Sequence, residues 1–138
     1  MITVLFACVH NAGRSRMAEA FFRDLADPDK ARSLSAGTDP APEVHPEVRA
    51  AMQEIGIDTG DEPPRRLTAE LAAEVDWLVT MGCGEACPVV PGVHLADWPF
   101  RDPKGGTPAE VRRIRDEVCA RVGEFIRQHG WQRPDTLS

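Results

Sequence analysis

The 138-residue chain has the size of a single domain with one hydrophobic core, and its 42% hydrophobic and 28% charged residues are ordinary for a globular protein. A net charge of −6, with basic residues scattered among acids, argues against binding to a phosphate backbone, so we expect no nucleic-acid partner. No apolar run approaches the roughly 18 residues that span a bilayer, and the N-terminus lacks the basic lead of a signal peptide, so we expect a cytoplasmic protein without membrane contact. We also expect a monomer.

The first predicted elements are a strand, a loop and a helix. Residues 2–7 form a continuous β-favouring apolar run, which is typical of a strand buried on both faces. A loop is expected at 8–13, and residues 14–25 carry apolar side chains at helical spacing until Asp27-Pro28 closes the segment. The chain is therefore predicted to pass from a strand through a tight loop into a helix N-terminus.

The following elements are predicted to alternate between strand and helix: a strand at 31–36, a helix from Pro46 with Ile55 on its apolar face, a short helix at 68–75, and strands at 77–81 and 93–96. The last helix has the clearest signals, because Thr107, Pro108 and Glu110 form a capping-box start and an apolar stripe follows. This helix should end before Gly130. We expect one domain at residues 1–130 and a loose tail at 131–138.

Alternating strands and helices predict an α/β fold, with a parallel sheet and helices on both faces. Ligands bind such sheets outside the carboxyl ends of the strands, where the strand order reverses. Cys8 follows the first strand and Cys83 the third. If the order is 2-1-3-4, those strands are neighbours roughly 5 Å apart, and both cysteines emerge at the same edge of the sheet.

Cys8 and Arg14 stand six positions apart on the loop that opens the first helix. Such a loop can curl around a tetrahedral oxyanion with its backbone N–H groups pointing inward, and Arg14 can grip two oxygens. The predicted oxyanion-binding residues are Val9, His10, Asn11, Ala12, Gly13 and Arg14. The positive potential of these N–H groups and of the helix N-terminus favours thiolate at Cys8, and the Ser15 hydroxyl is placed to donate to that sulfur.

Other interpretations of this loop are weaker. A buried cysteine in a strand-to-helix turn, with a surface arginine, would show the same spacing. The nucleotide-binding P-loop is excluded, because no Gly-Lys-Ser/Thr ending is present. Asn11 and Gly13 suit the positive φ values of a curled loop. We assign His10 no catalytic role.

At these residues the sequence resembles the low-molecular-weight protein tyrosine phosphatase superfamily, and within it the arsenate reductases that thioredoxin recycles. The resemblance covers nearly the whole chain, and its marks are Cys8 to Ser15, residues 16–20, Ser35-Ala36-Gly37, residues 80–83, Cys87-Pro88 and Asp102-Pro103. It implies a single-domain, low-molecular-weight phosphatase-like fold with a four-stranded parallel sheet in the order 2-1-3-4. It also implies arsenate as substrate, with phosphate or sulfate as mimics, and a role in arsenic detoxification.

Cys83 and Cys87 are four positions apart just beyond a predicted strand. In one helical turn their Cα atoms would lie about 6 Å apart, which permits a disulfide. A zinc site with His94 as third ligand and a pair of inert core cysteines are the alternatives. The resemblance implies a relay in which Cys83 attacks an arseno adduct on Cys8 and Cys87 then takes over the disulfide. The three residues between the pair are fewer than in the family's best-described members.

The resemblance also assigns the remaining roles. Asp102 is expected to be the general acid, with Asp97 as the less favoured alternative. Potassium is implied at Asn11, Glu19 and Ser35, and no tightly bound cofactor is expected. Thioredoxin is the expected reductant, although some relatives use mycothiol, or glutathione with glutaredoxin.

Two competing functions use the same cysteines differently. The first is a phosphatase acting on phosphotyrosine or a small phosphomonoester with Cys8, Arg14 and Asp102, although the chain has no tyrosine. The second is a metal or arsenite sensor, for which no DNA-binding element is evident. Cys119 is expected in the core, and the Arg65-Arg66 pair is expected to be exposed.

Overall fold

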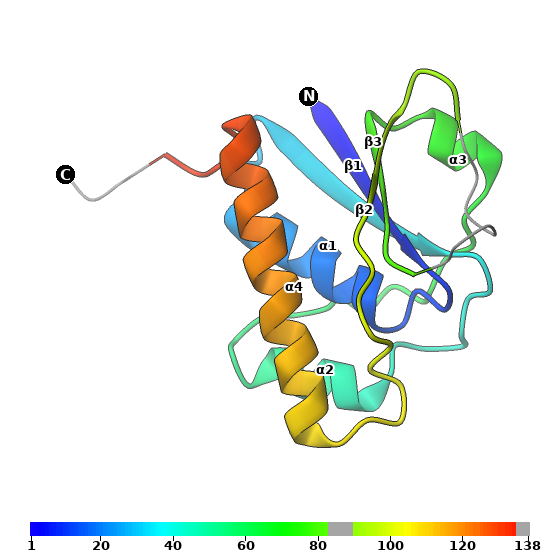
Figure 1. The fold of residues 1–138 in the computed structure, drawn as a ribbon, viewed down its shortest axis with the longest axis vertical. Coiled ribbons are helices and arrows are strands. Elements are labelled where there is room, and N and C mark those ends of the chain that lie inside the picture. Colours follow the sequence, from blue (N-terminus) through cyan, green and yellow to red (C-terminus); the bar gives the residue numbers. More distant parts are fainter. Residues whose placement is uncertain (83–89, 135–138) are drawn as a thin grey trace.

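The sheet has the predicted strand order. A computed structural model describes residues 1–82 and 90–134 (Figure 1). Within them lie four strands: β1 (Ile2–Cys8), β2 (Ala31–Gly37), β3 (Trp77–Thr80) and β4 (His94–Asp97). All pair in parallel, in the order β2-β1-β3-β4. The predicted parallel α/β fold with order 2-1-3-4 is therefore confirmed.

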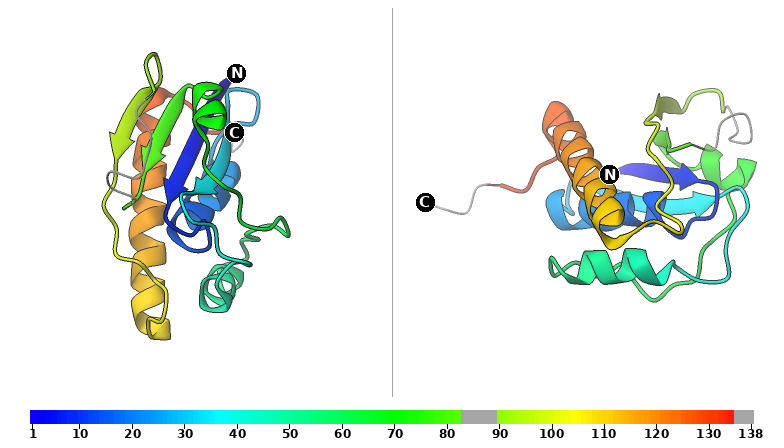
Figure 2. Two further views of the ribbon diagram at one scale, coloured as in Figure 1. Left: turned by 90° about the vertical axis from the view of Figure 1, so that its right-hand side faces the viewer. Right: turned by 60° about the horizontal axis from the view of Figure 1, so that its bottom comes forward.

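Helices cover both faces of this sheet. α1 (Arg14–Leu25), α2 (Pro46–Gln53) and α4 (Pro108–His129) pack on one face, where Val4, Phe6 and Cys8 point, and Figure 2 shows these helices grouped together. The short α3 (Ala69–Ala73) covers the other face, against Leu5 and Ala7. Because successive residues of β1 are buried on opposite faces, its sequence is a continuous apolar run. Among the described residues, no helix is both long and apolar enough to cross a membrane.

The ends of α4 confirm the capping signals. The Thr107 hydroxyl accepts from the Glu110 amide at 3.2 Å and donates to its carboxylate at 3.1 Å, with Pro108 in the first turn. Gly130 closes the helix in the left-handed conformation, at φ 72°.

Two segments differ from the expectation. α2 ends at Gln53, before Ile55, because the chain turns away through Gly56 at φ 75°. Ile55 is consequently 44% exposed and does not belong to the apolar face of that helix. Residues 131–133 pack on the domain instead of forming a loose tail. Trp131 stacks on His129 at 4.5 Å, and the Arg133 guanidinium donates to the carbonyls at the end of α1.

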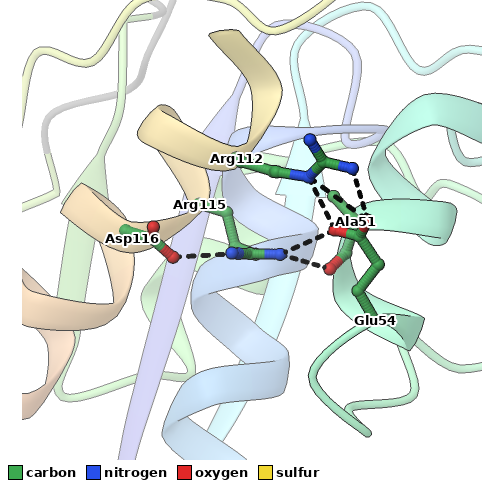
Figure 3. A network of polar contacts seen from close by, with 5 residues as sticks. All are labelled: Ala51, Glu54, Arg112, Arg115 and Asp116. Carbon is green, nitrogen blue, oxygen red and sulfur yellow. Dashed lines mark hydrogen bonds and ion pairs between the residues drawn. The ribbon is translucent and has the colours of Figure 1, made fainter. Parts of the chain in front are cut away.

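A polar network joins α2 to α4 (Figure 3). The buried Arg115 of α4 donates to the Ala51 carbonyl at 2.8 Å and to the Glu54 carboxylate at 3.1 Å. Arg112 makes a two-pronged contact with the same carboxylate, at 2.7 Å and 3.0 Å. The network fixes the far end of α2, whose N-terminus lies at the loop after β1.

Candidate active site

The loop between β1 and α1 has the polarity of an anion cradle. We call residues 8–14 the oxyanion loop. Its carbonyls at Cys8, Val9, His10 and Ala12 accept amide bonds of 2.7–3.1 Å from the segment 38–45, which runs along its outer side. Among the described residues, none of the amides of residues 9–14 donates to a protein acceptor, and no side chain caps α1. The amides are therefore available to an anion at a helix N-terminus.

Three hydrogen bonds in series lead to the sulfur of Cys8, which is buried. The Arg65 backbone amide donates to Asn11 Oδ1 at 2.9 Å, and because an amide can only donate, it fixes the orientation of the Asn11 side chain. Asn11 Nδ2 then donates to Ser15 Oγ at 2.9 Å. The Ser15 proton is left to point at Cys8 Sγ, 2.9 Å away. This arrangement stabilises a thiolate. Asn11 adopts the positive φ predicted for it, 51°, whereas Gly13, for which a positive φ was also predicted, has φ −136°.

Arg14 is held rigidly at the mouth of the loop. Its side chain is 8% exposed, Nη1 donates to the Phe100 carbonyl at 3.1 Å, and Nη2 lies 3.7 Å from an Asp102 oxygen. Gly82, at φ +101°, lies against Nη1 so closely that a Cβ there would collide with it. Nε is buried and has no partner within the described ranges, so it is a donor available to an oxyanion.

The structure brings Asp102, and not Asp97, to this loop. Asp102 is 42% exposed beside Arg14, and the adjoining Pro103 packs against Gly13. Asp97 lies in β4, where its carboxylate accepts the Thr80 hydroxyl at 2.7 Å. An exposed carboxyl at the mouth can exchange protons with solvent, as a general acid must.

His45 was missed by the sequence reasoning. It precedes α2, its amide donates to the Ala12 carbonyl at 3.0 Å, and its ring lies 6.2 Å from that of His10 at the rim. Burial lowers the pKa of His45, as do the nearby His10 and Lys104, while Glu47 and Asp102 act in the opposite direction. In the sequence, the position of His45 just before Pro46 indicated only the start of a helix. It gave no indication that His45 would contact the oxyanion loop.

The implied potassium ligands are only partly brought together. Ser35 donates to the Glu19 carboxylate at 2.6 Å. The Asn11 oxygen faces the Arg65 amide instead, so it is already used as an acceptor. Potassium binding by these three residues stays a prediction.

The other candidates have varied positions. Cys83 and Cys87 lie outside the described residues. His94, the suggested zinc ligand, stacks on Trp77 at 4.8 Å. Cys119 is half-buried against the core, and this burial raises the pKa of its thiol. Arg65 and Arg66 are exposed, as expected.

Comparisons with known proteins agree with this geometry. The family model described as low molecular weight phosphotyrosine protein phosphatase matches residues 3–133. A putative arsenate reductase of Halobacterium salinarum is 39% identical over 88% of both chains. An arsenate reductase of Brevibacillus brevis is 35% identical over 89% of this chain and 92% of its own. The solved structure of a thioredoxin-dependent arsenate reductase of Corynebacterium glutamicum superposes with a TM-score of 0.81 at 37% identity, over 93% of this chain. This chain spans 61% of that longer one.

Proposed function

The chain belongs to the low molecular weight phosphotyrosine protein phosphatase family, and we propose that it is an arsenate reductase with Cys8 as its nucleophile. One observation carries the proposal beyond the family. Gly82, the residue before Cys83, lies against the guanidinium of Arg14, which is the oxyanion-gripping side chain of the site. A chain that only hydrolysed esters would need no further thiol next in sequence to that position.

In the first step, the Cys8 thiolate attacks the arsenic of a bound arsenate. The loop amides and Arg14 hold its oxygens, while Ser15 stabilises the thiolate before attack. A sulfur–arsenic bond forms and an arsenic–oxygen bond breaks. The departing oxygen takes a proton from Asp102 and leaves as water.

In the second step, the Cys83 thiolate attacks the sulfur of Cys8. The disulfide forms as the sulfur–arsenic bond breaks, and its electron pair stays on arsenic, which is reduced from As(V) to As(III) and leaves as arsenite. Cys87 then attacks Cys83, which frees Cys8 and leaves a Cys83–Cys87 disulfide. The two thiols have supplied the two electrons.

An external dithiol must return two electrons to that disulfide in every cycle. We propose thioredoxin, which the name of the Corynebacterium glutamicum relative supports. Mycothiol, or glutathione with glutaredoxin, would instead resolve the adduct without the pair.

The test is arsenate-dependent NADPH oxidation with thioredoxin and thioredoxin reductase. We expect turnover by the wild type, none by Cys8→Ser, and none beyond a single cycle by Cys87→Ser. Cys119→Ser is the matched control, because this thiol of α4 packs on the core near Asp24, at the opposite end of α1 from the loop, and it should retain activity within about twofold. If the protein turned over with mycothiol or with glutaredoxin but not with thioredoxin, the relay would be rejected. If it turned over with no thiol donor, the proposal that it reduces arsenate would be rejected.

Hydrolysis of phosphomonoesters is the second candidate function. The Asp102 carboxylate lies 3.7 Å from Arg14, so the site combines a nucleophile (Cys8), an oxyanion-binding guanidinium (Arg14) and a general acid (Asp102). Hydrolysis of p-nitrophenyl phosphate is measured beside arsenate turnover. Brisk ester hydrolysis without arsenate reduction would assign the chain to this function. Ester hydrolysis that survives Cys83→Ser, together with arsenate reduction that does not, would support both activities at one nucleophile.

A further inference from the structure

Arg16 is a buried cation that the proposed chemistry does not use. It follows Ser15 in α1 and is 4% exposed. Burial lowers its pKa, while the nearby carboxylates of Glu19 and Glu62 favour the charged form. Burying a guanidinium is costly unless hydrogen bonds compensate it. Its Nη2 donates to the carbonyls of Thr59 and Glu62, at 3.1 Å and 2.7 Å.

Two further arginines bind the same stretch of chain. Arg23 donates to the Asp58 carbonyl at 2.6 Å, and Arg49 donates to the Gly60 carbonyl at 3.3 Å. Arg23 is exposed and Arg49 half-buried, so only Arg16 acts from the interior. The segment 58–62 is thus fixed to α1 and α2 through its backbone carbonyls.

The fixed segment leads directly to the amide that orients Asn11. Glu62 is followed by Pro63 and Pro64, whose rings fix φ and disfavour helical geometry in the preceding residue. The next amide is that of Arg65, which donates to Asn11 Oδ1 at 2.9 Å, while the Arg65 carbonyl accepts from Gly37 at 2.8 Å. A displacement of the Glu62 carbonyl is therefore transmitted through a stiff link.

We propose that Arg16 is a positioning residue for the nucleophile: by holding the Thr59 and Glu62 carbonyls, it sets the Arg65 amide that aims Asn11 and Ser15 at Cys8. The inference rests on the proposed role of Cys8 as nucleophile. It does not depend on arsenate being the substrate.

The test is the pH profile of Cys8 alkylation by iodoacetamide, followed by mass spectrometry of the peptide that contains Cys8. Arg16→Met keeps the length of the side chain but removes the bonds to both carbonyls. We expect its alkylation midpoint to move up by about one pH unit, as for loss of a hydrogen bond to the charged form. Arg23→Met is the matched control, because this exposed arginine of α1 bonds only to the Asp58 carbonyl and to neither carbonyl that Arg16 holds, and it should leave the profile unchanged.

Repeating the measurement in a second variant distinguishes an effect of Arg16 through the series of hydrogen bonds from a direct effect of its charge on Cys8. In a Ser15→Ala protein the series of bonds is already broken, so adding Arg16→Met should move the midpoint no further. An equal shift in both backgrounds would mean that the Arg16 charge acts through space, and no shift in either would remove its role. Both results would overturn the proposal.

Pro64→Gly guards against failure of Arg16→Met to fold. It leaves Arg16 in place and loosens only the link to Arg65, so it should move the midpoint in the same direction. An unchanged profile in this variant would also overturn the proposal. Because alkylation requires no arsenate, a failure of arsenate turnover does not affect any of these outcomes.

Discussion

Replacing Gly82 with alanine should disable the oxyanion grip without touching the nucleophile. The added Cβ would occupy the space of Arg14 Nη1, which donates to the Phe100 carbonyl at 3.1 Å. Arg14 must therefore move or rotate. The substitution also strains the backbone, because φ at Gly82 is +101°, a value that costs a residue with a side chain about 1–3 kcal/mol.

The cost to binding follows from what Arg14 would lose. Two charge-assisted hydrogen bonds to an oxyanion contribute about 1.5–3 kcal/mol each. Losing about 3 kcal/mol corresponds to a roughly hundredfold fall in kcat/KM, at about 1.36 kcal/mol per tenfold. Sulfate and arsenate affinity measured by calorimetry should fall in parallel.

Gly92→Ala is the matched control for the strain. Gly92 has φ +84°, but no atom lies within 4 Å of its Cβ position. Urea unfolding should show a loss of stability from backbone strain in both variants, with a further loss in Gly82→Ala from the displaced Arg14, while oxyanion binding falls only in Gly82→Ala. If Gly82→Ala binds sulfate within twofold of the wild type, the argument from the Arg14 contact is wrong.

Three further predictions concern stability. Hydrogen bonds from Arg112 are the largest cause that lowers the pKa of Glu54 from 4.5, so the stability its carboxylate contributes is present above pH 4.5 and lost as pH falls through the lower folded-state value. The difference in urea midpoint between the wild type and Glu54→Gln should therefore shrink between pH 7 and pH 3, and a constant difference would contradict it. Burial lowers the pKa of His45 from 6.5, so its contribution is complete above pH 6.5 and decreases as pH falls below it; unfolding of His45→Gln should be less sensitive to pH in that window, and equal sensitivity would count against the assignment. Phe22 is fully buried and Ile55 is 44% exposed, so Phe22→Ala should lower the free energy of unfolding by about 3–5 kcal/mol and Ile55→Ala by less than about 0.5 kcal/mol, and comparable losses in urea titrations would contradict the packing.

Patterns local in the sequence predicted most of the fold. The unbroken apolar run of β1 reflects burial on both faces, and the Thr107 capping box marked the start of α4 correctly. Ile55 was misassigned because helical spacing continues past Gln53, whereas the helix end depends on the turn at Gly56. Periodicity reports which face is apolar and does not report where a helix stops.

For the candidate site, the sequence predicted the functional side chains but not the backbone groups that orient them. Cys8, Arg14 and Ser15 are one short motif, so their proximity follows from sequence spacing. The groups that orient them are a carbonyl at Phe100 and an amide at Arg65, 86 and 54 positions from their partners. Every residue has a backbone carbonyl and every residue except proline has a backbone amide N–H, so no residue type marks these two in advance.

The outward bonds of the oxyanion loop have a consequence for selectivity. Because the segment 38–45 holds the carbonyls of this loop, the cradle is formed before any anion arrives, and little binding energy is needed to order it. Backbone amides and a guanidinium respond to charge and tetrahedral shape, which arsenate and phosphate share. Phosphate should therefore compete with arsenate for the same loop. Discrimination should arise after binding: the Cys8 thiolate attacks bound arsenate, whereas bound phosphate dissociates unchanged.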